Sequence, residues 1–281
     1  MFQQTRMALA LVLGLFLAAC GPAVVTDPAQ QANIYTQATQ AYDAQDFTTA
    51  ANLLQQIAPA GHMYAQNLLG LMYEKGRGVV ANPEQAAYWY TQSADQGYDV
   101  AQANLAYMYE RGLGVPEDLF KAMNLYKLAA EQGNARGQLD LGYFFEHGLG
   151  TIQNYGMAAF WYRKSAEQGN AVAYNNLGVL YLHGKGVAQD QAEARVLFAL
   201  SAGLGNHYGF FNLGYAYYNG LGGETYLVEG YALMLLAQER GNNSANEEIN
   251  AISNPPDQQA VDRVLRQLRA GDYSQMPNKF E

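Results

Sequence analysis

The heptapeptide YERGLGV, residues 109–115, places two glycines one residue apart beside a cation, and closely related stretches occur four more times. These are YEKGRGV from Tyr73, FEHGLGT from Phe145, YLHGKGV from Tyr181 and YYNGLGG from Tyr217. The first glycines of the five stretches follow one another at steps of 36 residues: Gly76, Gly112, Gly148, Gly184 and Gly220. A fixed period of this length is typical of repeat proteins whose similar units stack on one another.

Each 36-residue unit predicts two amphipathic helices. Before the glycine loop, residues of one face recur at i, i+4 and i+8: Ala65, Leu69 and Tyr73. After the loop the same spacing returns: Ala86, Tyr90 and Ala94. Such spacing places each set on one side of a helix. Because a single helix pair cannot bury both of its apolar faces, the units must stack.

The glycine pair itself suits either a phosphate loop or the end of a helix. A phosphate loop follows a strand and carries Lys and Ser/Thr at fixed positions. Here the glycines follow a predicted helix, and Lys75 or Arg111 just before them matches the negative end of a helix dipole. Gly76 and its counterparts therefore predict the left-handed conformation that closes helix C-termini.

These repeated residues resemble the Sel1-like repeat family, which is related to the tetratricopeptide repeat. The family pattern of Ala, Leu-Gly, Tyr, Gly-x-Gly-Val, Ala, Trp-Tyr and Gln-Gly matches residues 65–97. Residues 101–133 match it as well, except that Leu105-Ala106 and Leu125-Tyr126 stand at the Leu-Gly and Trp-Tyr positions, and the resemblance extends over about Gly61 to Gly241. It weakens late, where Gly222-Gly223 replaces Gly-Val. The fold that it implies is all-α, a right-handed α-solenoid of antiparallel helix pairs.

The N-terminus predicts an export signal. Arg6 precedes an apolar run from Met7 to Phe16 that ends in Leu17–Cys20, LAAC. The run is shorter than the roughly 20 apolar residues that a membrane span needs. Its ending resembles a bacterial lipobox, which implies cleavage after residue 19 and lipidation of Cys20. The Gly21 that follows favours the outer membrane, with the protein facing the periplasm.

Composition restricts the classes of partner. The chain has 281 residues, a formal net charge of −9 and a single cysteine, Cys20, so no internal disulfide can form. Loss of residues 1–19 would remove one cation, Arg6, and change the charge from −9 to −10. An acidic chain without a basic run argues against nucleic acid as a partner.

Composition and spacing also predict the remaining segments of the chain. Residues 20–31 predict a polar tether, 32–60 a leading tetratricopeptide-like unit, 61–241 the Sel1-like repeats, 242–270 capping helices and 271–281 a loose tail. The last capping helix is expected to start at Pro255-Pro256. Its apolar stripe includes Val261 and Leu268, and its other face is polar, as a terminal cap requires.

Catalytic and metal-binding patterns are missing from the sequence. No Gly-x-Ser-x-Gly, His-Glu-x-x-His or Ser-x-x-Lys occurs. His147 and His183 share one repeat position, whereas zinc needs three or four ligands around one point. Some cysteine-rich Sel1-like relatives are described as penicillin-binding or β-lactamase-like, but this chain lacks paired cysteines. We therefore expect a protein that is not an enzyme and needs no cofactor or metal.

The family resemblance implies that the first helix of each unit lines the concave side of the solenoid. Its non-core positions are the predicted partner-binding residues: Tyr107, Arg111, Tyr143, His147, His183, Tyr215 and Tyr218. Tyrosine suits such a surface because it offers a large contact area at low entropic cost. Alternatively, the tyrosines pack between units and the Glu-Lys and Glu-Arg neighbours are merely solvated.

Three functions remain open from the sequence. The first is a lipid-anchored, periplasm-facing adaptor that binds other envelope proteins or peptides. The second, suggested by Sel1-like lipoproteins of exopolysaccharide secretion, is an accessory that handles exopolysaccharide or peptidoglycan. The third is a β-lactamase-like hydrolase, which the missing nucleophile motif disfavours.

Overall fold

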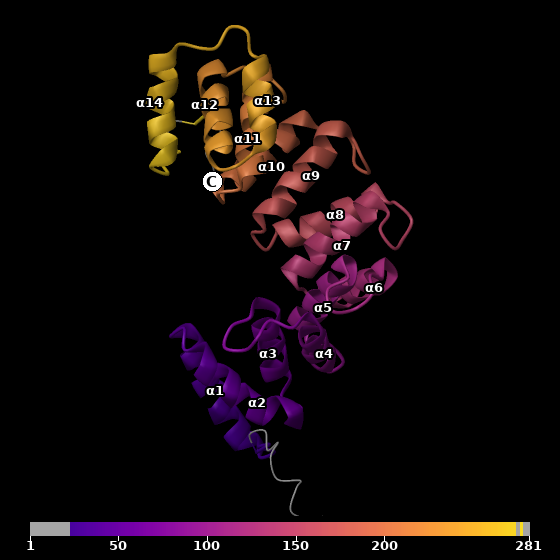
Figure 1. Ribbon diagram of the computed structural model, residues 1–281. Helices are drawn as coiled ribbons and strands as arrows, with labels where there is room; N and C mark the ends of the chain where they lie inside the picture. The colour runs from indigo at the N-terminus through magenta and orange to yellow at the C-terminus, as the bar shows by residue number, and fades with distance from the viewer. Residues whose placement is uncertain (1–22, 274–275, 278–281) are drawn as a thin grey trace, which may run out of the picture. The chain divides into compact units, whose positions relative to one another are not determined.

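The structure, a computed structural model, describes residues 23–273 and 276–277 (Figure 1). Within these ranges it contains fourteen α-helices, one short 3₁₀ helix and no strand. The prediction of an all-α repeat fold is therefore confirmed. Cys20 and the apolar run before it lie outside the described residues.

The helices follow one another in pairs. A leading pair, α1 (Pro28–Asp43) and α2 (Phe47–Ile57), is followed by the 3₁₀ helix Ala58–Ala60. Five repeats come next: α3 (Met63–Lys75) with α4 (Pro83–Ala94), α5 (Asp99–Arg111) with α6 (Leu119–Glu131), α7 (Ala135–His147) with α8 (Tyr155–Ala166), α9 (Ala171–His183) with α10 (Gln191–Gly203), and α11 (His207–Asn219) with α12 (Leu227–Glu239). The chain continues with α13 (Asn243–Ala251) and α14 (Gln258–Arg269), and both pack on α12 (Figure 1).

The chain forms two compact units. Of the described residues, the first contains 23–108 together with 112–116, and the second contains 109–111, 117–273 and 276–277. In the first unit, Leu54, Leu69 and Met72 are fully buried in one apolar cluster. In the second, Tyr162 and Leu180 belong to one cluster, and the helices from α10 to α14 share another.

Capping residues explain where the helices start and stop. The second helix of each of the first four repeats begins after a side chain that accepts a backbone N–H of the first turn: Asn82, Asp118, Asn154 and Asp190. The first helix of each repeat ends at a glycine in the left-handed conformation, with φ between 63° and 69°: Gly76, Gly112, Gly148, Gly184 and Gly220. The capping interpretation of the first glycine is confirmed.

Small residues let the two helices of a repeat approach closely. A Cβ atom placed on Gly142 of α7 would lie 2.7 Å from Cδ1 of Tyr162 on α8. The ring of Tyr162 is itself fully buried. Glycine at this position therefore makes room for the largest core side chain of the repeat.

Three predicted boundaries differ from the structure. Helix α1 begins at Pro28, inside the predicted tether, because Asp27 caps it and proline suits its first position. Helix α14 begins at Gln258, two residues beyond Pro256, since Asp257 is its cap. The predicted tail is not loose throughout, because Tyr273 and Met276 pack on the C-terminal cluster.

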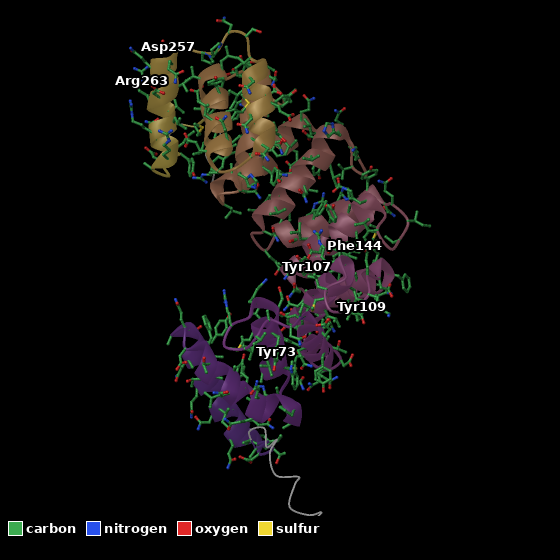
Figure 2. All side chains as sticks on the ribbon, in the orientation of Figure 1. Tyr73, Tyr107, Tyr109, Phe144, Asp257 and Arg263 are labelled. Atoms are coloured by element: carbon green, nitrogen blue, oxygen red, sulfur yellow. The ribbon has the colours of Figure 1, made fainter. Side chains whose placement is uncertain are left out.

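The expected polar face of α14 is present. Val261, Leu265 and Leu268 are buried, whereas Arg263 is exposed and points away from α12 (Figure 2). Arg269 forms an ion pair with Glu239 of α12. The last helix thus covers the apolar side of the final repeat and presents charged groups to solvent.

Candidate functional site

The candidate site is a surface on the first helices of the second unit. Four positions, spaced i, i+4, i+7 and i+11, lie on one face of each of these helices. On α7 they are Arg136, Asp140, Tyr143 and His147; on α9, Val172, Asn176, Val179 and His183; on α11, Tyr208, Asn212, Tyr215 and Asn219. We call these twelve residues the first-helix stripe.

The α7 part of the stripe is ordered by contacts within the helix. Arg136 Nε lies 3.5 Å from Asp140 Oδ2. The rings of Tyr143 and His147 lie 4.1 Å apart at 32°, and His147 Nδ1 lies 3.0 Å from the Tyr143 carbonyl oxygen. Tyr143 remains 42% exposed. The stacked pair therefore presents a preformed aromatic surface to solvent.

Amide side chains link the stripe to the core in the next two repeats. Asn212 Nδ2 donates to Asn175 Oδ1 at 2.7 Å, which ties α11 to α9. Within α9, Asn175 Nδ2 donates to Oδ1 of the stripe residue Asn176 at 3.4 Å. Because these polar groups have defined partners, the surface around them is fixed in place.

Four of the predicted partner-binding residues lie on this stripe: Tyr143, His147, His183 and Tyr215. Tyr107 occupies the equivalent position on α5, in the first unit, and is partly buried (Figure 2). Arg111, whose side chain is 60% exposed, pairs with Glu110 at 3.4 Å. Tyr218 is partly buried at the edge of the stripe. The role of all seven in binding remains a prediction.

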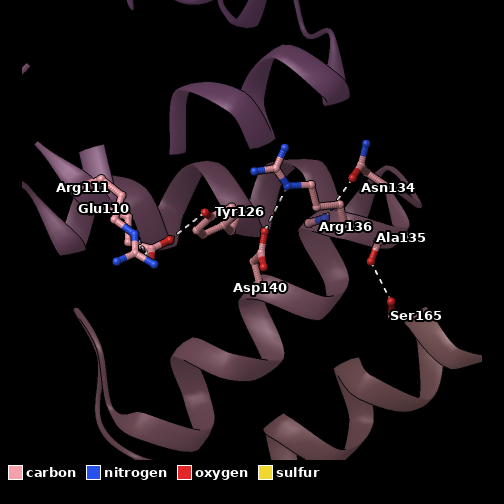
Figure 3. A network of polar contacts seen from close by, with 9 residues as sticks. Glu110, Arg111, Tyr126, Asn134, Ala135, Arg136, Asp140 and Ser165 are labelled. Atoms are coloured by element: carbon pink, nitrogen blue, oxygen red, sulfur yellow. Dashed lines mark hydrogen bonds and ion pairs between the residues drawn. The ribbon is translucent and has the colours of Figure 1, made fainter. Parts of the chain in front are cut away.

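Glu110 and Glu146 are structural rather than free surface charges. The buried Tyr126 donates its hydroxyl hydrogen to Glu110 Oε2 at 2.8 Å (Figure 3). The buried Tyr162 donates in the same way to Glu146. In the first repeat Tyr90 donates to Glu74 at 2.7 Å. These bonds join the two helices of each repeat. The glutamate carboxylates therefore have partners on the second helix of the repeat, which the sequence of the first helix does not indicate.

Asp140 is the stripe residue whose ionisation the fold changes most. Burial raises the pKa of its carboxyl to about 6; the nearby Glu110 acts in the same direction and Arg136 in the opposite one. Figure 3 shows Asp140 pointing toward Arg136, with Tyr126 and Glu110 in the same network. Asp140 is not among the residues predicted from the sequence. The 36-residue step contained a signal, because Asp140 stands where other repeats have Asn104, Asn176 and Asn212.

The geometry offers no metal-binding group in the part of the chain that the structure describes. Within residues 23–273 and 276–277, no cluster of three or more His, Cys, Asp or Glu side chains could hold a metal ion. His147 and His183 lie on different helices, α7 and α9.

Among the described residues, no helix is both long enough and apolar enough to cross a membrane.

The pattern of the Sel1 repeat matches five consecutive segments: 64–98, 99–134, 135–170, 171–206 and 211–242. Together these segments cover more than half of the sequence. The chain belongs to the Sel1 repeat family. The first four segments follow the helix pairs from α3 to α10, and the fifth begins inside α11 and ends just after α12, so each Sel1 repeat corresponds to one helical hairpin. No curated protein matches the chain.

Among the solved structures that share this fold, two are similar over most of this chain. A Sel1 repeat protein from Oxalobacter formigenes is 28% identical, with a TM-score of 0.75, over 85% of this chain and 96% of its own. A protective antigen present in uropathogenic Escherichia coli strains, displaying an SLR fold, is 30% identical, with a TM-score of 0.73, over 87% of this chain. This chain spans only 54% of that antigen. The predicted Sel1 solenoid is thus confirmed.

Proposed function

We propose that this Sel1 repeat protein is a non-enzymatic adaptor that binds other envelope proteins or peptides through the first-helix stripe. The observation that carries the proposal is the exposed, stacked Tyr143–His147 pair within a row of tyrosine and amide side chains on α7, α9 and α11. Tyrosine, ordered before the partner arrives, contributes contact area at low entropic cost.

A binding experiment with a matched control tests this proposal. Affinity capture from envelope extracts should recover the same partner proteins with the wild type and with Phe160→Ala. Phe160 lies on the second helix α8 and is 44% exposed, close to the 42% of Tyr143. The double variant Tyr143→Ala, Tyr215→Ala should lose those partners while its helical circular dichroism is retained. Undiminished recovery by the double variant would refute the assignment.

The membrane anchor is part of the same proposal. The small-small-Cys ending at Cys20 supports lipidation, with the mature protein held on the outer membrane and facing the periplasm. Cys20→Ser should abolish labelling by radioactive palmitate and release the protein into the soluble periplasmic fraction. Labelling that persists in this variant would reject the anchor.

A glycan is the second candidate ligand, and the α11 part of the stripe favours it. Tyr208, Asn212, Tyr215 and Asn219 provide aromatic rings and amides with no acidic or basic side chain among them. Such a surface suits a neutral, hydroxyl-rich polymer as well as a peptide. Purified peptidoglycan and exopolysaccharide, added as competitors in the capture experiment, distinguish the two. Displacement of the protein partners by a polymer would favour a polysaccharide-handling accessory.

A further inference from the structure

A cluster of aromatic rings lies in the first unit and contains none of the residues of the stripe. It contains Tyr35 of α1, His62 and Tyr64 at the start of α3, and Tyr98 at the start of α5. The ring centroids of Tyr35 and His62 are 4.9 Å apart, those of Tyr35 and Tyr64 6.1 Å, and those of Tyr64 and Tyr98 5.0 Å. We call these four residues the tyrosine platform.

At Tyr98 the platform replaces a helix cap that the later repeats retain. At the start of α7, α9, α11 and α13 an asparagine accepts backbone N–H groups: Asn134, Asn170, Asn206 and Asn242. His62 still accepts from the Ala65 N–H at 3.2 Å, but Tyr98 makes no such bond. A missing cap lowers the folding equilibrium constant by about fivefold. Such a departure from the local rule is expected where a residue serves binding rather than stability.

The surroundings of the platform are suited to a positive charge. None of its four rings has a lysine or arginine over it within the described chain. Burial raises the pKa of the Tyr98 hydroxyl, and Tyr35, Asp99 and Tyr64 act in the same direction. Tyr64 is 43% exposed, so a ring is accessible to solvent. Aromatic faces attract cations electrostatically.

We infer that the tyrosine platform docks an arginine side chain from a partner protein. A planar guanidinium stacks on exposed rings, and it is less strongly hydrated than a lysine ammonium. The chain uses this pairing internally, because the guanidinium carbon of Arg195 lies 4.2 Å from the Tyr217 ring centroid and that of Arg240 4.5 Å from Phe210. The net charge of −9 attracts a basic partner in addition.

A charged peptide and its uncharged counterpart test the inference on the full chain. The peptide acetyl-Gly-Gly-Arg-Gly-Gly-amide should shift the NMR signals of the tyrosine rings of the platform. Its citrulline counterpart, which keeps the shape and removes the charge, should bind roughly two- to fivefold more weakly. Equal binding of the two peptides would overturn the inference.

Matched variants locate the binding. Tyr64→Ala should weaken the arginine peptide, whereas Tyr208→Ala should not, although Tyr208 holds the same position in the last repeat and is 49% exposed. Tyr98→Asn should lose the peptide and yet raise the folding equilibrium constant about fivefold by restoring the cap, which separates binding from misfolding. If the arginine peptide binds equally well to Tyr64→Ala and to Tyr98→Asn, the inference is wrong, because the binding then reflects general attraction to an acidic chain. Tyr143→Ala should leave binding of the arginine peptide unchanged, so this test does not depend on the proposed role of the first-helix stripe.

Discussion

At the scale of single residues, the two glycines of each loop have different structural roles. The first ends a helix, and its conformation could be predicted because it depends only on neighbours in the sequence. The second, such as Gly150 with φ of 61°, faces the backbone of the preceding repeat, where a Cβ atom would overlap the carbonyl of Leu119. That contact joins residues distant in the sequence, so the heptapeptide alone could not indicate it.

Substituting the two glycines of one loop separates these roles. Gly148→Ala should lower the free energy of unfolding by about 1–2 kcal/mol, the cost of a left-handed alanine. Gly150→Ala should cost about 2–4 kcal/mol, because overpacking adds to the same backbone strain. Urea denaturation of both variants measures the difference. Equal losses would contradict the close approach between loop and preceding helix.

Asp140 predicts a pH dependence of stability. Its pKa, raised by burial to about 6, lies above the value in an unfolded chain, so the folded protein binds more protons between about pH 4 and 6. Stability from this group is therefore fully present at low pH and is lost as the pH rises through 6. Asp140→Asn should raise the free energy of unfolding by about 1–2 kcal/mol at pH 8.

The advantage of Asp140→Asn should shrink as the pH falls through 6 and vanish near the ordinary carboxyl pKa of about 4. Urea denaturation of wild type and variant at pH 8, 6 and 4.5 follows this change. A constant difference at all three values would show that Asp140 ionises normally. Asparagine fits the site because Asn104, Asn176 and Asn212 occupy the same repeat position.

At the scale of helices, the Tyr–Glu bond joins the two members of a repeat, and its partners change together. Tyr162 pairs with Glu146 in the third repeat, whereas the fourth repeat has Phe198 and Leu182 at the same positions. Both hydrogen-bonding groups are thus absent at once. This is expected because a carboxylate at this position, once its buried partner is removed, loses a charge-assisted bond.

Exchanging this pair tests the role of the bond. Tyr162→Phe should lower the free energy of unfolding by about 1–2 kcal/mol, since Glu146 loses its partner. Adding Glu146→Leu, which copies the fourth repeat, should recover most of that loss. Thermal and urea denaturation of the two single variants and the double variant give the coupling energy. Additive losses in the double variant would mean that the hydrogen bond does not link α7 to α8.

The helix pairs themselves were predictable, whereas several of their ends were not. Spacing of Ala65, Leu69 and Tyr73 indicates α3 directly, because a helical period needs only local residues. The polar residues 20–31 predict a tether, so the local pattern does not indicate that α1 begins at Pro28. Packing of Met276 on the C-terminal cluster depends on tertiary contacts that no local pattern contains.

At the scale of the whole molecule, repetition explains both the fold and the candidate site. Each Sel1 repeat places the same helix face in an equivalent position, so a step of 36 residues brings Tyr143, Val179 and Tyr215 to matching places on α7, α9 and α11. Local spacing could predict which residues share that face. It could not predict that the neighbouring carboxylates of Glu110 and Glu146 are held by buried tyrosines.

The most direct test of the central claim is site-specific photo-crosslinking in intact cells. A photoreactive phenylalanine analogue is introduced at Tyr143 on the first-helix stripe and, separately, at Phe160 on α8. The two side chains are about equally exposed, so the comparison reports location rather than accessibility. We predict that position 143 yields discrete protein adducts and that position 160 does not. Adducts of equal yield at the two positions, or adducts at position 160 alone, would contradict a binding surface on the first helices.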